Sequence, residues 1–328
     1  MPGSALDYQL VSITAEERLV EFSTAFDAAY VAAESTPWAM DLGLVINSRY
    51  RQRIPVPVDA PCVKLASGDD HYRELYVGDI EFEPAPYSDG IKEKSDVIEA
   101  PDFVGWGQAP ENMAREFRRN LNAITAAMLE ANPYLDIYRV RRPGGNTAST
   151  INLFSASHKV NLIDSARGTQ SNVIAQGTYV NFTEDLHTAV RTHFSGWKAA
   201  NGEKMELVAT DLLVPTGRVA AAEKYYGRDT IIEEGTAGVI QAPNIYQNAV
   251  KVHEVAKLTD ADYVYYVCRQ IPAWVVQTGG TPDEIRFDKT SDSWKRDGLI
   301  KIGYRAIQGV AGLLPHGILR VDLKATSR

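Results

Sequence analysis

The amino-acid sequence predicts an α+β fold, and three observations support this prediction. Amphipathic helical patterns occur in the first part of the chain, at residues 15–33 and 111–131. A helix, a buried strand and a second helix then follow one another closely, and the last third of the chain is mostly strand. Two proline-interrupted stretches, at 36–62 and 82–110, match neither pattern. We therefore expect a compact α/β layer with a long helix and two extended segments attached.

The composition is that of a folded protein. The chain has 328 residues and a formal net charge of −8, with 45% hydrophobic and 23% charged residues. The acidic balance argues against a protein that grips nucleic acid, which needs clustered Lys and Arg. Cys62 and Cys268 show neither metal-ligand nor disulfide spacing. No run approaches the roughly 18 apolar residues of a membrane-spanning helix, and the first residues lack a signal-peptide pattern.

The first helix, at 15–33, is predicted from its periodicity and from its start. One face carries apolar side chains three or four positions apart, namely Leu19, Phe22, Phe26 and Tyr30. Thr14 is the expected N-cap, and Glu17 three residues later completes a capping-box pattern. Pro37 follows the last turn and prevents the helix from continuing.

The second helix, at 111–131, has the clearest pattern in the chain. Its apolar face is formed by Met113, Phe117, Leu121, Ile124 and Met128. Pro110 precedes the first turn, and the Asn132-Pro133 pair stops the helix. At 1.5 Å per residue the segment forms a rod of roughly 30 Å.

The centre and the end of the chain alternate helices and strands. A helix at 184–199 has Thr183 as its N-cap, a strand at 207–214 ends at Pro215, and a short helix at 217–226 stops at Gly227. Five further strands are expected from runs rich in β-branched and aromatic residues. They lie at 250–255, 263–268, 285–288, 299–307 and 318–323.

The two extended stretches pose a packing question. They carry large apolar side chains at intervals: Trp38, Leu42, Leu44, Val45 and Ile46 in the first, and Ile91, Val97, Ile98, Phe103, Val104 and Trp106 in the second. Each such side chain gains roughly 1.5–3 kcal/mol on leaving water. The residues must therefore be buried against their own domain or against a neighbouring subunit, and the composition favours neither.

A search for catalytic motifs finds none. The sequence has no phosphate-binding loop, no GxGxxG after a strand, no GxSxG elbow and no HExxH. His187 and His193 are six residues apart on one helix, which is not the spacing of two metal ligands. The carboxylates of Asp69 and Asp70, next to His71, are expected to be solvated. We therefore assign no catalytic, cofactor-binding or metal-binding residue and expect no cofactor.

Four motifs in a fixed order carry a family resemblance. They are Leu153-Phe154-Ser155-Ala156-Ser157-His158, then the strand Leu207 to Pro215, then the alanine-rich segment Val219 to Glu223, and finally Asp260-Ala261-Asp262 before the aromatic strand Tyr263 to Tyr266. Over about 111–307 the chain resembles the major head subunits of tailed bacteriophages, in particular the Mu-like head subunit family.

The resemblance implies the Johnson fold of tailed-phage capsid subunits and a division of the chain. The implied parts are an N-terminal arm at 1–60, an extended hairpin loop at 61–108, a peripheral domain with its long spine helix at 109–133 and its β part at 269–312, an axial domain at 134–268, and a C-terminal return at 313–328. In that family arms and loops lie over adjacent subunits, so the resemblance favours burial of both extended stretches against neighbours.

The function implied is that of a structural protein and not of an enzyme. Copies of the chain would form pentamers and hexamers of an icosahedral shell around double-stranded DNA, which is enclosed without sequence-specific binding. Scaffolding, portal or decoration proteins are further partners, and no membrane is involved. The location is the virion, after assembly in the host cytoplasm. Two alternatives remain: an encapsulin-type nanocompartment shell, and a soluble α/β enzyme using separated residues such as His158, Asp164 and His253.

Overall fold

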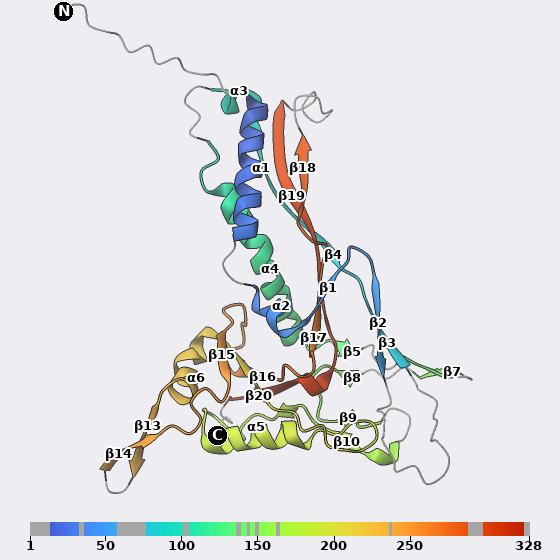
Figure 1. Ribbon diagram of the computed structural model, residues 1–328, viewed down its shortest axis with the longest axis vertical. Coiled ribbons are helices and arrows are strands. Elements are labelled where there is room, and N and C mark those ends of the chain that lie inside the picture. Colours follow the sequence, from blue (N-terminus) through green and yellow to red (C-terminus); the bar gives the residue numbers. More distant parts are fainter. Residues whose placement is uncertain are drawn as a thin grey trace, which may run out of the picture.

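A computed structural model gives the chain as a tall rod standing on a broader base (Figure 1). The structure describes residues 14–32, 36–57, 77–100, 105–135, 139–142, 145–147, 151–161, 165–235, 238–287 and 298–324. Expectations that concern Cys62, Asp69 to His71, Phe103, Val104 and Asp164 fall outside these ranges. No helix among the described residues is long and apolar enough to cross a membrane.

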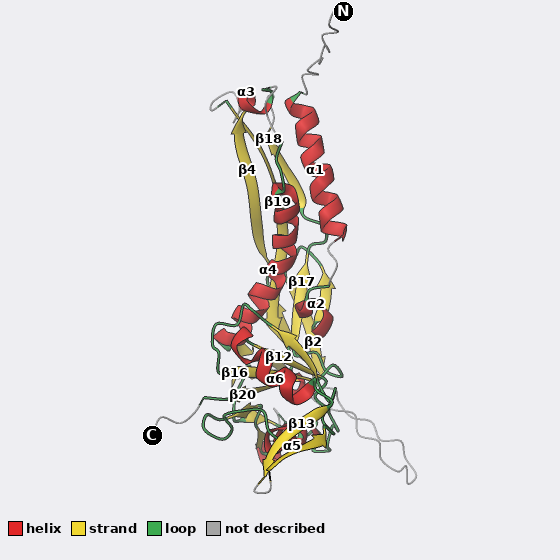
Figure 2. Cartoon of the chain, turned by 90° about the vertical axis from the view of Figure 1, so that its left-hand side faces the viewer, coloured by secondary structure: helices red, strands yellow, loops and turns green. Residues whose placement is uncertain are grey.

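The rod consists of two helices lying over a sheet (Figure 2). The helices are α1 (Ala15–Ala32) and α4 (Ala109–Ala131), which confirms both helix predictions. The sheet strands of the rod are β4 (Ala85–Lys94), β18 (Asp283–Phe287) and β19 (Leu299–Gly312). The capping box of α1 is also confirmed, because Thr14 N donates to Glu17 Oε2 at 2.8 Å and Glu17 N donates to Thr14 Oγ1 at 3.3 Å.

The core of the rod lies between the helices and the upper half of β19. Alternate residues of this strand point at the helices, as a strand with one buried face requires, and they are Ile300, Ile302, Tyr304 and Ala306. The facing helical side chains are Leu19, Phe22 and Phe26 from α1 and Met113 and Phe117 from α4. The predicted apolar faces therefore pack against each other within one chain.

Towards its lower end, α4 buries a different face from the one predicted. Ile124 and Met128 are only partly buried, whereas Ala126 and Leu129 are fully buried. The lower end of the helix leaves the core of the rod and packs into a second core at the foot of the rod. The buried face of α4 shifts around the helix because the lower half packs against different elements from the upper half. The helix ends at Asn132, which adopts a left-handed conformation with φ 48°.

The extended stretches are more regular than the sequence suggested. Residues 36–57 form α2 (Trp38–Leu42), β1 (Leu44–Asn47) and β2 (Gln52–Pro57), and residues 85–98 form β4 and α3 (Ser95–Ile98). Strand β1 pairs in parallel with β17 (Trp274–Thr278), and β4 pairs antiparallel with β19 over its whole length. The expectation that these stretches fit no compact element is therefore wrong for the described residues.

Most apolar side chains of these stretches are buried against their own chain. Leu42 and Ile98 are fully buried, and a further four side chains are packed against a core, namely Trp38, Ile46, Ile91 and Trp106. Leu44, Val45 and Val97 remain about 40% exposed. The preference for burial against neighbouring subunits is thus wrong for Leu42 and Ile98, and the four packed side chains are partly buried within their own chain. The rod supplies a helix layer and a sheet that the sequence pattern could not place beside them.

The described residues of the expected hairpin loop, 61–108, pair with strands in two different places. Strand β2 pairs with β3 (Val77–Phe82), and β3 continues to β6 (Arg139–Arg142) and β7 (Gly145–Thr147) in one sheet. This ribbon starts at Gln52, and β4 lies in the rod. Strand β4 lies within the expected loop and pairs with β19, over 200 residues away along the chain.

The base is built on a five-stranded sheet with the strand order β11-β20-β16-β12-β15. The strands are β11 (Val173–Ile174), β20 (Ile318–Asp322), β16 (Tyr263–Val267), β12 (Asp211–Val214) and β15 (Lys251–Glu254). Helices α5 (Glu184–Gly196) and α6 (Val219–Tyr226) cover one face, where Leu212 and Tyr266 point. Leu213 and Tyr265 point the other way, into the core at the foot of the rod. Burial on both faces explains why the central strands β12 and β16 are mostly apolar.

The remaining elements are short. Three antiparallel pairs are formed by β5 (Tyr134–Leu135) with β8 (Ile151–Asn152), β9 (His158–Lys159) with β10 (Thr169–Gln170), and β13 (Thr230–Gly235) with β14 (Gly238–Pro243). Turns of 3-10 helix lie at Ser165–Arg167, Thr216–Arg218 and Pro315–Gly317. The N-cap of α5 is confirmed, since Leu186 N donates to Thr183 Oγ1 at 3.2 Å. The strand expected at 207–214 is shorter and starts at Asp211.

Candidate functional site

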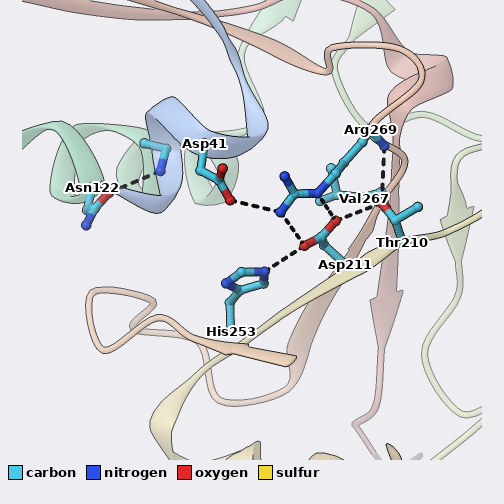
Figure 3. Close-up of polar contacts among 8 residues, drawn as sticks. Asp41, Asn122, Thr210, Asp211, His253, Val267 and Arg269 are labelled. Carbon is cyan, nitrogen blue, oxygen red and sulfur yellow. Dashed lines mark hydrogen bonds and ion pairs between the residues drawn. The ribbon is translucent and has the colours of Figure 1, made fainter. Parts of the chain in front are cut away.

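The junction between rod and base holds a buried carboxylate network (Figure 3). Asp211 is 1% exposed, and it accepts hydrogen bonds from His253 Nε2 at 2.7 Å and from Thr210 Oγ1 at 2.7 Å. Arg269 donates to the same carboxylate from Nε at 2.7 Å and from Nη2 at 2.9 Å. A buried charge is tolerated only when it is paired and hydrogen-bonded, and Asp211 meets both conditions.

Strand pairing brings these residues together. Asp211 opens β12, and in the antiparallel register it lies opposite Val267 of β16, two residues before Arg269. On its other side β12 pairs in parallel with β15, where Leu213 lies opposite His253. The three polar side chains thus come from three adjacent strands or strand ends, with His253 and Arg269 lying 42 and 58 residues after Asp211 in the sequence.

The electrostatics favour the ionised form of Asp211. Burial alone raises the pKa of its carboxyl, but hydrogen bonds from His253, Arg269 and Thr210 together hold this pKa well below its usual value. The two carboxylates beside Arg269 raise the pKa of its guanidinium. Asp211 and Arg269 therefore carry opposite charges at neutral pH.

The network also reaches the N-terminal part of the chain. Arg269 Nη2 donates to Asp41 Oδ2 of α2 at 2.8 Å, and this bond is the largest cause of the lowered pKa of Asp41. Helix α2 is held on two further sides: Ala39 N donates to Asn122 Oδ1 of α4 at 3.2 Å, and Trp274 Nε1 donates to Ala39 O at 2.9 Å. Helix α2 therefore binds the base through Arg269, the helix α4 through Asn122 and the strand β17 through Trp274.

The arrangement suits mechanical fixation better than catalysis. A Thr210, Asp211 and His253 set contains the residue types of a hydrolytic triad, but the geometry does not fit one. Thr210 Oγ1 lies against the carboxylate and not against the imidazole, and both carboxylate oxygens are occupied by Arg269. Within the described residues, no group of three or more His, Cys, Asp or Glu side chains could hold a metal ion.

The residues of the enzyme alternative are not gathered at one site. His253 bonds to Asp211 in the base sheet, whereas His158 is buried beside Asn172, with Nε2 3.0 Å from Asn172 Oδ1. Burial lowers the pKa of His158. Asp164 lies outside the described residues. His187 contacts Tyr226 Oη at 3.4 Å inside the base, and burial lowers its pKa as well.

The motif at 153–158 is a structural turn. Asn132 and Phe154 pair reciprocally, since Phe154 N donates to Asn132 Oδ1 at 2.7 Å and Asn132 Nδ2 donates to Phe154 O at 3.1 Å. Asn172, fully buried, accepts from Ser155 N at 2.9 Å and donates to Leu153 O at 2.8 Å. Two asparagines therefore fix the turn that leads the chain from the end of α4 into the base.

Sequence reasoning missed the residues of the junction. Asp41, Asp211 and Arg269 each looked like an ordinary charged residue, and the only available signal was the position of Asp211 inside an otherwise apolar run. Glu130 was missed too: its carboxylate accepts from Thr259 Oγ1 and Asp260 N, both at 2.9 Å, and so ties the end of α4 to the turn before β16.

Comparison with known proteins finds similarity among solved structures. No family model and no curated protein matches the sequence. Among solved structures, the capsid protein of a native GTA particle is similar over 89% of this chain and 91% of that chain, with a TM-score of 0.54 and 11% identity. The chain has the fold of tailed-phage capsid subunits. The predicted fold class is therefore confirmed.

Two further structures share this capsid fold. The mature capsid of bacteriophage PhiM1 matches with a TM-score of 0.50 and 11% identity, covering 87% of this chain and 86% of that chain. The SrpI encapsulin complex from Synechococcus elongatus matches with a TM-score of 0.50 and 8% identity, covering 90% and 91%. Because the matches span almost the full length of each partner, the capsid fold includes both the rod and the base.

Proposed function

We propose that this chain is the major head subunit of a tailed bacteriophage, which closes into an icosahedral shell around packaged double-stranded DNA. The observation that carries the proposal is the capsid fold, shared over 89% of the chain with a GTA capsid protein. The four ordered motifs, from Leu153 to Tyr266, support the finer assignment to the Mu-like head subunit family.

We assign the parts of the fold to the parts of such a subunit. The base, with its five-stranded sheet and helices α5 and α6, is the axial domain, and the rod with α4 as its spine helix is the peripheral domain. The ribbon of β2 and β3 is the extended hairpin, at 52–82 in place of 61–108. Copies would meet around five-fold and six-fold axes through heterologous contacts, which close into rings.

The junction network joins the part assigned as the axial domain to the part assigned as the peripheral domain. Arg269 ties the base to α2, and Glu130 ties the lower end of α4 to the turn at Thr259 and Asp260. These two ties, made at different points, oppose rotation of the rod on the base.

The subunit acts without catalysing a reaction. The net charge of −8 supports a container wall to which DNA does not adhere. Its principal partner is a further copy of itself, and scaffolding, portal or decoration proteins are secondary partners. The place of action is the virion, following assembly in the host cytoplasm.

The direct test is to produce the full chain in bacteria and to examine it by size-exclusion chromatography and negative-stain electron microscopy. Closed shells or ring-shaped capsomers of five or six copies are the expected result. A chain that stays monomeric or dimeric at every concentration would overturn the proposal.

An encapsulin-type shell is the second candidate, and the observation that favours it is the match to the SrpI encapsulin over 90% of this chain. Antibodies raised against the recombinant chain distinguish a phage head subunit from an encapsulin-type shell protein. Immunogold labelling of tailed particles is expected for a head subunit. Labelling confined to tail-less protein shells that hold an enzyme would favour the encapsulin.

A further inference from the structure

The sheet of the rod has a second face, turned away from α1 and α4, and no described helix or strand covers the upper half of this face (Figure 1). Because side chains alternate along a strand, the pairing register tells which residues belong to it. We name this set the back face, and its members are Ser88, Gly90 and Lys92 of β4, Lys301, Gly303 and Arg305 of β19, and Ile285 of β18.

The back face is basic. The exposed side chains of Lys92 and Arg305 have no ion-pair partner among the described residues. Asp283 lies opposite Arg305 in the register, but its carboxylate is bound by Arg49, whose Nη2 donates to Asp283 Oδ1 at 2.7 Å. Between the rows of Lys92 and Arg305, the row of Gly90 and Gly303 carries no side chain on either strand. Another backbone can therefore come close to the sheet there.

The outer face of α1 carries the opposite charge. Residues three or four positions apart point away from the core of the rod, and all of them are exposed: Glu16, Val20, Thr24, Asp27 and Val31. The two valines are 53% and 78% exposed. This stripe, named here the α1 stripe, therefore combines two carboxylates with two exposed apolar side chains and contains no cation.

The spacing of the α1 stripe matches the spacing of the rows on the back face. Four residues of a helix rise about 6 Å, and two residues of a strand rise about 6.6 Å. If Glu16 lies beside Lys92, Val20 lies over the glycine row. Asp27 then comes within reach of the long side chain of Arg305. Charge and shape are therefore complementary in one and the same register.

The α1 stripe and the back face also lie at the same level of the rod. Glu16 O accepts a hydrogen bond at 3.5 Å from Nη2 of Arg286, which lies opposite Ile302 of β19. Further down, Ser23 Oγ donates to Glu284 Oε2 of β18 at 2.8 Å. Helix α1 and strand β19 start at the same end of the rod (Figure 1). Two rods that stand side by side at equal height therefore bring the stripe of one copy level with the back face of the other.

We propose that the α1 stripe of one copy docks on the back face of a second copy, with α1 parallel to β19. Glu16 and Asp27 pair with Lys92 and Arg305, and Val20 covers the glycine row. The contact is heterologous, because the stripe and the back face lie on different sides of the rod, so each copy can touch two neighbours. This inference rests on the proposed function, because it names one of the contacts by which the copies would hold together.

The contact is expected to be weak by itself. A helix of 18 residues is about 27 Å long, so the contact buries a few hundred Å² per copy. Stable complexes bury roughly 800 Å² per partner. The rods should therefore pair within assembled particles, where many contacts add up, and not as dimers in dilute solution.

Cysteine crosslinking in assembled particles tests the arrangement, in a Cys62→Ser background that leaves only the buried Cys268. Thr24 and Ser88 are both exposed, and the proposed register brings them to the same row, within the roughly 7 Å between Cα atoms that a disulfide requires. The double variant with Thr24→Cys and Ser88→Cys should give a ladder of dimers, trimers and longer chains on non-reducing gels, because each copy is joined to two neighbours.

The single variants are the matched controls. Particles of Thr24→Cys alone or of Ser88→Cys alone should give monomers, and particles assembled from a mixture of the two should give dimers and nothing longer. Dimers from a single variant, or a double variant that stops at dimers, would show a contact between like faces and overturn the proposal. Normal particles without crosslinks refute the α1 contact alone, whereas a wild-type chain that forms no particles refutes the proposed function.

A charge exchange in the double-cysteine variant tests the two surfaces separately. Glu16→Lys with Asp27→Lys should abolish the ladder, and so should Lys92→Glu with Arg305→Glu. The combination of all four is expected to restore it, because the same pairs then form with reversed signs. Loss without restoration, with an unchanged circular dichroism spectrum, would overturn the pairing.

The control for total charge is Arg115→Glu with Arg119→Glu, which changes the charge by as much as the substitutions on the back face. Both side chains are more than half exposed on α4, outside the proposed contact. The ladder should remain intact in this control. Its loss there would show that the total charge of the rod, and not the pairing of the two faces, governs the crosslinks, and would overturn the proposal.

Discussion

Arg269 donates two hydrogen bonds to the buried carboxylate of Asp211, and its guanidinium also reaches Asp41 at 2.8 Å. One side chain therefore joins the base sheet to α2, which itself rests on α4 and β17. The two ends of this bridge differ in energy. The Asp211 side chain is 1% exposed, whereas that of Asp41 is 43% exposed.

The substitution Arg269→Met should destabilise the fold by about 2–3 kcal/mol, because it leaves a buried carboxylate without its main partner. Urea unfolding at pH 7, followed by tryptophan fluorescence, measures the loss. Asp41→Asn is the matched control: it removes only the exposed end of the bridge and should cost about 0–1 kcal/mol. Equal losses for the two variants would mean that the bridge to Asp41, and not the buried end, carries the stability.

Gly303→Ala should destabilise the rod by about 2–3 kcal/mol. Gly303 of β19 lies directly opposite Gly90 of β4, and a Cβ on Gly303 would come 2.5 Å from Asp89 O. The strands would have to separate to admit the methyl group. Thermal unfolding measures the effect, and Gly217→Ala serves as control, since no atom lies within 4 Å of its added Cβ. A Gly303 variant as stable as the control would show that β4 does not approach β19 so closely.

Phe26→Ala should cost about 3–5 kcal/mol, as expected for an aromatic side chain deleted from a packed core. The Phe26 ring is fully buried, stacks on Tyr304 of β19 and meets Phe117 of α4 edge to face at 6.1 Å. Val31→Ala on the exposed face of the same helix should be nearly neutral in unassembled subunits. If Phe26→Ala were also neutral in denaturant unfolding, α1 would not be packed on its own rod.

Acidification between pH 6.5 and 5 should weaken the fold through buried histidines. Burial and the nearby His158 lower the pKa of His316 to about 4, and the His316 ring packs on Trp197 at 4.7 Å. The ordinary value is 6.5, so the unfolded chain binds protons first and stability falls as the pH falls through this window. Carboxylates with a lowered pKa, such as that of Asp41, change the stability only at lower pH, where they begin to bind protons.

We expect His316 to account for about 1–2 kcal/mol of the loss between pH 7.5 and pH 5. Urea midpoints of the wild type and of His316→Gln at both pH values measure this share, and the variant should lose less stability than the wild type on acidification. The buried Nδ1 of His158 has no hydrogen-bond partner within the described structure, which adds to the cost of protonation there. An equal loss in the two proteins would assign the pH dependence to other groups.

Local patterns predicted the four longer helices, α1, α4, α5 and α6, and six of the strands, because the causes of these elements lie within a few residues. Thr14 and Glu17 meet across one helical turn, and the apolar face of Leu19, Phe22 and Phe26 repeats with the helical period, so both were visible in the sequence. Strands β12 and β16 of the base were visible as mostly apolar runs. The buried face of the lower half of α4 was predicted wrongly, because Leu129 packs into a core formed by residues that are distant in the sequence.

The amino-acid sequence by itself determined the positions of the four longer helices and of six strands, and it contains no recognisable catalytic motif. Only the tertiary structure decided that β4 pairs with β19, that the ribbon starts at Gln52, and that Asp41, Asp211 and Arg269 form one network. The reason is physical. Helix periodicity and capping depend on neighbours in the chain, whereas strand partners and buried ion pairs are chosen among residues that meet only after the chain has folded.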